Sequence, residues 1–142
     1  MKKYSLDIYD RSRVNKEILT EIVNLFVVKE KRSRFLEFIE SPKRYDDFLW
    51  ELLNDPRHLK PECIIELPGN EQTVEMFSRK LRKLGAGDEA YLISSNDEVD
   101  GKIGSLEETI SSVYGEGLVY CLDSNLGYYE GHENWRYILR AV

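Results

Sequence analysis

Apolar positions near the C-terminus fall into three short segments separated by polar turns. Residues 118–122 are an almost continuous apolar run, which is typical of a strand buried on both faces. Residues 126–130 follow the polar turn 123–125, and residues 135–141 alternate with a period of two after a second polar turn. We therefore predict a three-stranded antiparallel meander at the end of the sequence.

Helical spacing of apolar residues dominates the first sixty positions. It runs from Val14 to Phe26, returns at residues 35–39, and returns again at residues 48–53 after a Ser-Pro helix start. We interpret the charged stretch 29–34 as a solvated break between helices rather than a phosphate-binding patch. A short strand is predicted earlier, at residues 4–8. Tyr45 and Trp50 lie off the apolar stripe of the third helix, where aromatic residues usually still belong to the core.

The remaining residues predict the order β-α-β-α-β-β-β over residues 62–142. Asn70 is the expected cap of the first helix in this region, Gly85 its C-terminal stop, and Ser105 with Glu108 a capping box for the next helix. The two crossovers should be right-handed and give locally parallel strands. We thus predict an α+β fold, with an N-terminal helical region packed on a mixed sheet that ends in an antiparallel meander. Residues 1–142 form one domain, or divide into a mostly helical region, residues 1–60, and a sheet region, residues 61–142.

The composition is typical of a folded protein without a membrane span. Of the 142 residues 42% are hydrophobic, which is enough for an ordered core. No apolar run approaches the roughly 18 residues of a membrane span, and no cationic leader precedes an apolar segment. We expect a cytoplasmic protein in which Cys63 and Cys121 are buried free thiols.

The charge is unevenly distributed. Residues 1–60 carry 13 Lys/Arg and 11 Asp/Glu, a net of +2, whereas residues 61–142 carry 7 and 15, a net of −8. An acidic second half would repel nucleic-acid phosphates, so we expect no nucleic acid bound there. It suits a basic protein partner or a cation, although solubility alone also accounts for it.

Residues 96–107 match the spacing of an EF-hand calcium loop. Its oxygen ligands would come from Asn96, Glu98, Asp100 and Glu107, with Gly101 at the sharp turn. Against this, the first ligand is Asn rather than Asp, and the entering element is a strand rather than a helix. The helix start and an Asp-Gly turn explain the same residues, so we favour a turn and helix cap and keep Ca²⁺ as the alternative cofactor.

A second group of polar residues surrounds the meander turns. Glu130, His132 and Glu133 could bind a metal or act in acid–base catalysis, but Asp123 should lie one strand length away, about 15 Å. The sequence has no Gly-x-Ser-x-Gly, no Cys-x-x-Cys and no phosphate-binding loop. We find no catalytic signature.

These observations favour a protein that acts by binding, in a regulatory or inhibitory interaction with a protein partner. Aromatic residues beside carboxylates can anchor and steer a basic partner. The candidate contact residues are Tyr128, Tyr129, Glu130, His132 and Trp135. The alternative is a metal-dependent protein or enzyme that uses the Asn96–Glu107 loop or the Glu130/His132 turn.

Overall fold

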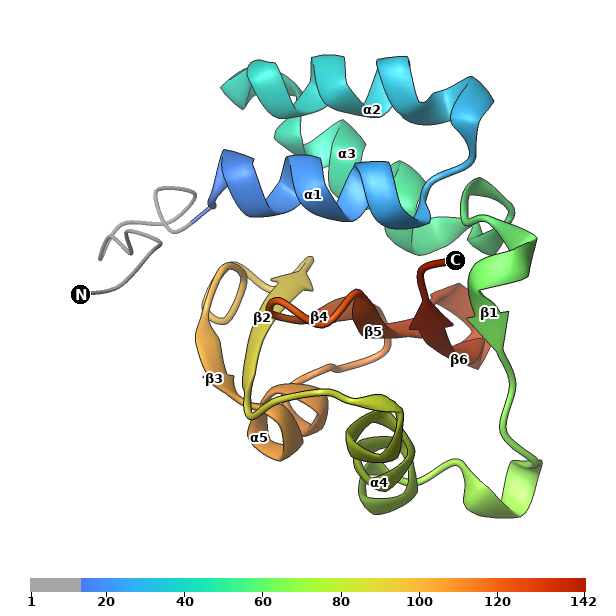
Figure 1. Cartoon of the computed structure of the whole chain (residues 1–142). Helices are drawn as coiled ribbons and strands as arrows, with labels where there is room; N and C mark the ends of the chain where they lie inside the picture. The colour runs from blue at the N-terminus through green and yellow to red at the C-terminus, as the bar shows by residue number, and fades with distance from the viewer. Residues whose placement is uncertain (1–13) are drawn as a thin grey trace.

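The computed structural model describes residues 14–142, so the strand predicted at residues 4–8 lies outside the described residues. The described region has three layers, with a sheet between two layers of helices (Figure 1). The helices are α1 (Lys16–Phe26), α2 (Lys29–Glu40), α3 (Tyr45–Asn54), α4 (Val74–Leu84) and α5 (Leu106–Ser111). The strands are β1 (Ile64–Ile65), β2 (Glu89–Ser94), β3 (Ile103–Ser105), β4 (Gly117–Cys121), β5 (Leu126–Glu130) and β6 (Arg136–Arg140).

The strand order is β1-β6-β5-β4-β2-β3, and all neighbouring pairs are antiparallel. This confirms the α+β class and the C-terminal meander. The structure differs from the expectation of parallel pairs after the crossovers. Residues 103–105 form the short strand β3 and reverse the chain before α5, so that β4 pairs with β2 in the antiparallel sense. The first strand of the order predicted for residues 62–142 is reduced to β1, which pairs with β6 at the far edge.

The sheet is buried on both faces. Helices α1–α3 pack on one face around residues such as Phe26, Phe35 and Phe48, and this core also includes Tyr91 and Tyr129 from the sheet. Helices α4 and α5 pack on the other face. Each residue of β4 is buried, which confirms the prediction for residues 118–121, whereas Leu122 lies beyond the strand and is half-buried. Residues from both halves of the sequence therefore share the first core.

Local sequence signals explain several helix ends. Gly85 adopts a left-handed conformation (φ 118°) and closes α4, and Ser105 caps α5 through the backbone N–H of Glu108. The cap of α4 is Thr73 rather than Asn70, because the chain first makes a short 3₁₀ turn at Gly69–Glu71. The charged stretch 29–34 is not a break between helices. It is the first half of α2, which begins shortly after α1 ends.

Candidate binding surface

The register of the sheet aligns the ends of four strands. Ser94 of β2 pairs with Gly117 of β4, Gly117 pairs with Glu130 of β5, and Glu130 pairs with Arg136 of β6. The residues just beyond this row therefore emerge together, although they are far apart in the sequence. They are the start of the β2–β3 loop, the segment that enters β4, and the turn between β5 and β6.

Helix α3 is held to the sheet near the same end by two buried hydrogen bonds. At its N-terminus, the Tyr45 hydroxyl donates to Asp100 Oδ2 at 2.7 Å, and Asp100 Oδ1 accepts from the Ser94 backbone N–H at 2.8 Å. In its last turn, the Leu52 carbonyl accepts from the Tyr129 hydroxyl at 2.9 Å. Apolar packing of its inner stripe fixes the helix further, so its outer residues are presented beside the ends of the strands.

Three exposed aromatic residues occur along this end. Trp50 on α3 is 65% exposed, Tyr114 before β4 is 83% exposed, and Trp135 before β6 is 38% exposed. In the described region of the chain the other exposed large hydrophobic residues are Val74 and Val142. Burying such rings removes a large apolar area from water, so clustered exposed aromatic residues are typical of interfaces.

Two hollows border α3 here. A small one of about 140 Å³ is lined by Asp46, Leu49, Trp50, Leu53, Ser95 and Glu116. A larger one of about 470 Å³ is lined by Asn54, Asp55, Pro56, Arg57, Trp135 and Tyr137. Leu53 lines the first hollow and Asn54 lines the second, so both hollows border the last turn of the helix. We call Asp46, Trp50, Ser95, Tyr114, Glu116 and Trp135 the aromatic surface.

Among the described residues that line the two hollows, the carboxylates are Asp46, Glu116 and Asp55, and the cation is Arg57. Asp46 and Glu116 line the first hollow, and the exposed Asp97 and Glu98 follow Ser95 in the neighbouring loop. In the second hollow Arg57 binds Asp55 through two nitrogen atoms, which lowers the pKa of that carboxyl group. The surface therefore presents aromatic rings in an acidic setting.

The structure corrects three of the five contact residues predicted from the sequence. Tyr128, Tyr129 and Glu130 are buried, because β5 lies between β4 and β6 with helices on both faces. The Tyr128 hydroxyl donates to Glu130 Oε1 at 2.6 Å, and burial raises the pKa of both tyrosines. His132 and Trp135 are exposed at the predicted turn.

Trp50, the exposed ring on α3, was not among the contact residues predicted from the sequence. Its position off the apolar stripe was a usable signal, together with the carboxylates of Asp46 and Asp47 at the preceding turn. Tyr45, which is also off the stripe, is buried because its hydroxyl reaches Asp100. Periodicity alone could not separate these two outcomes.

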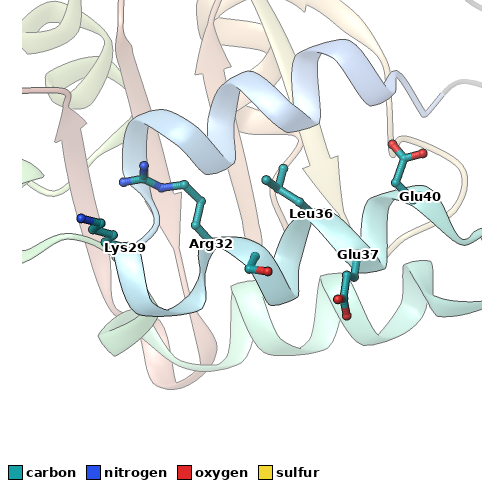
Figure 2. A pocket seen from close by; sticks show the side chains of 6 residues that line it. Lys29, Arg32, Leu36, Glu37 and Glu40 are labelled. Carbon is teal, nitrogen blue, oxygen red and sulfur yellow. The ribbon is translucent and has the colours of Figure 1, made fainter.

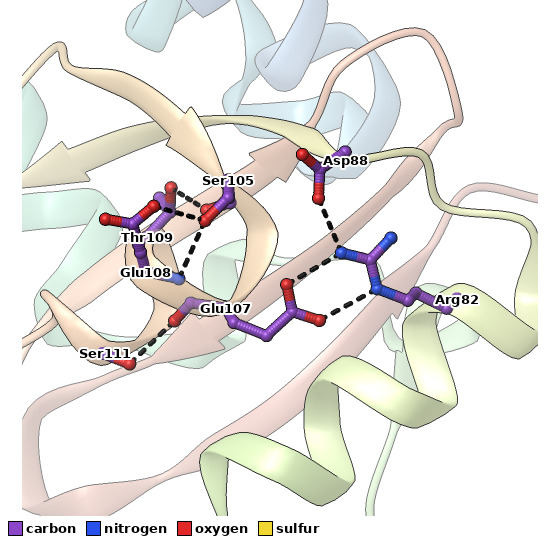
Figure 3. Close-up of polar contacts among 7 residues, drawn as sticks. All are labelled: Arg82, Asp88, Ser105, Glu107, Glu108, Thr109 and Ser111. Atoms are coloured by element: carbon purple, nitrogen blue, oxygen red, sulfur yellow. Dashed lines mark hydrogen bonds and ion pairs between the residues drawn. The ribbon is translucent and has the colours of Figure 1, made fainter.

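The four residues proposed for calcium do not converge on one point. Asp100 is buried and turned toward α3, on one face of the sheet. Glu107 forms a bidentate ion pair with Arg82 of α4, on the other face, at 2.7 and 2.9 Å (Figure 3). Asn96 Oδ1 accepts from the backbone N–H of Glu98, which closes a local turn. Within residues 14–142, no group of three or more His, Cys, Asp or Glu residues could hold a metal ion.

Both cysteines are buried free thiols. Burial raises the pKa of the Cys121 thiol to about 12 and also raises that of Cys63. A thiolate is the reactive form, so neither environment suits a nucleophile at neutral pH. Asp123 lies at the opposite end of β5 from His132, so these residues do not form a joint site.

Comparison with protein-family models, curated proteins and solved structures found no match. Among the helices of residues 14–142, none has both the length and the apolar character needed to cross a bilayer.

Proposed function

We propose that this protein acts by binding a basic surface of another protein at the aromatic surface, in a regulatory or inhibitory role. The observation that carries the proposal is the placement of Trp50 in one hollow with Asp46 and Glu116, while Tyr114 and Trp135 lie just before the aligned ends of β4 and β6. Tryptophan and tyrosine are frequent hot-spot residues of protein interfaces, because each buries a large area and loses little conformational entropy on binding.

Charge supports a basic partner. Carboxylates around the rings would attract Lys and Arg side chains during encounter and would accept hydrogen bonds from them at the rim. An interaction of this kind weakens as salt rises, because exposed charges are screened over about 10 Å at roughly 0.1 M ionic strength. The buried free thiols fit a reducing compartment, so we propose that the interaction takes place in the cytoplasm.

Site-specific photocrosslinking tests the proposal. Benzoyl-phenylalanine replaces Trp50 in one variant and Arg79, an exposed residue of α4, in a matched control. We expect a discrete crosslinked protein from position 50 that is absent from position 79, and the crosslink should fade in high salt. It should also be lost when Glu116→Lys is added to the position-50 variant. Equal crosslinking from both positions, or a crosslink that tolerates Glu116→Lys and high salt, would contradict the proposal.

A further inference from the structure

A stripe of mostly polar and charged residues runs along the outer side of α2 and shares no residue with the aromatic surface. It comprises Lys29, Arg32, Ser33, Leu36, Glu37 and Glu40, which line a shallow hollow of about 600 Å³ (Figure 2). Successive members of the stripe are alternately three residues and one residue apart, which places them on one face of the helix. The stripe is about 16 Å long. Within residues 14–142, the four charged side chains of this stripe make no ion pair.

The charges of the stripe are separated along the helix. Lys29 and Arg32 lie at the N-terminal end, and Glu37 and Glu40 at the C-terminal end, as Figure 2 shows. The central positions are Ser33, which is small, and Leu36, which is partly buried against the core and partly open to solvent. This order is opposite to the one that the helix dipole favours, so the helix itself does not account for it.

The two ends and the centre of the stripe are complementary to each other when a second copy is turned end for end. A two-fold axis midway along the stripe places position 29 of one helix opposite position 40 of the other, and position 33 opposite position 36. Each Lys29 then faces a Glu40, and each Leu36 faces the small Ser33, which permits close approach of the helices. Isologous contacts of this kind are the usual basis of two-fold dimers.

We infer that the outer face of α2 is a self-association surface, on which two copies of this chain pack their α2 helices antiparallel. Arg32 and Glu37 lie on opposite flanks of the stripe, so each meets its own equivalent from the other copy. Glu37 is exposed and Arg32 is half-buried with its Nε covered, so solvent screening weakens the repulsion at the Glu37 flank more than at the Arg32 flank. A single helix pair buries less than the roughly 1,200 Å² of a standard interface, so the dimer should be weak and reversible.

Charge reversal in separate chains gives a sharp test by sedimentation velocity. Wild-type protein should dimerise at low salt as its concentration rises. Lys29→Glu or Glu40→Lys alone should raise the dissociation constant of the dimer by about tenfold or more, because like charges then face each other at two places in the interface. An equimolar mixture of the two variants should dimerise again, because the two carboxylates of one chain then face the two ammonium groups of the other. Glu30→Lys, an equal charge change outside the stripe, should have little effect.

Circular dichroism would first establish that each variant is folded. If a charge-reversal variant does not fold, the neutral variants Lys29→Gln and Glu40→Gln are tested instead, and each should dimerise more weakly than wild type. Wild-type protein that stays monomeric at low salt, or a mixture no more associated than its components, would overturn the inference. The aromatic surface is untouched by these changes, so the outcome is independent of the proposed partner binding.

Discussion

The buried hydroxyl of Tyr129 provides a sensitive test of how α3 is attached to the sheet. This hydroxyl donates to the Leu52 carbonyl at 2.9 Å. A helical carbonyl normally accepts from the N–H four residues later, but that residue is Pro56, which has no N–H. The tyrosine from β5 therefore supplies a donor that the local sequence cannot.

Replacing Tyr129 with Phe isolates this hydrogen bond. The ring should stay in place, because it is fully buried and stacks on Tyr137 with centroids 6.2 Å apart. The substitution then leaves the buried Leu52 carbonyl without this donor, which should lower the free energy of unfolding by about 1–3 kcal/mol. For a domain of this size each kcal/mol lowers the melting temperature by about 2–4 °C.

Urea unfolding of wild type, Tyr129→Phe and Tyr114→Phe measures the effect. Tyr114 is 83% exposed, so its hydroxyl should contribute less than about 0.5 kcal/mol. The midpoint for Tyr129→Phe should fall while the dependence on urea stays the same, because the surface exposed on unfolding is unchanged. If Tyr129→Phe lost no more stability than Tyr114→Phe, the hydrogen bond from β5 to the last turn of α3 would not contribute to stability.

Further predictions concern the thiols, the acidic loop and the sheet. Cys63 and Cys121 should react with a thiol reagent only on unfolding, and rapid labelling of the native protein would contradict their burial. Calcium should leave the melting temperature of wild type and Glu107→Gln unchanged, and a calcium-induced rise abolished by that substitution would revive the calcium site. Arg82 lowers the pKa of Glu107, so the ion pair stabilises the folded protein above pH 4.5, modestly at this exposed site. Acid titration should show this stability being lost as the pH falls through the lowered pKa. If wild type and Glu107→Gln lost the same amount of stability over that pH range, the prediction would be wrong. Gly127→Ala should cost about 1–3 kcal/mol in urea unfolding, because its new Cβ would lie 2.8 Å from a backbone carbonyl of β4, and an unchanged midpoint would show that the strands can separate freely.

The sequence by itself determined the elements whose signals are local. The apolar run at 118–122 identified a strand buried on both faces, and the period of two after Trp135 identified the last strand of the meander. Gly85 and Ser105 marked a helix end and a helix start, because a left-handed turn and a side-chain cap depend on only a few adjacent residues.

Only the tertiary structure decided which side chains face solvent and which polar groups meet. Tyr129 and Trp135 both belong to the meander, yet one is buried under α3 and the other is exposed, because α1–α3 cover the middle of the sheet and leave the turn before β6 open. Glu107 fits a calcium spacing in sequence, but its partner is Arg82, which is 25 positions away on α4. Burial and pairing depend on strand order and on helices packed from elsewhere in the chain, and periodicity within one segment carries no information about either.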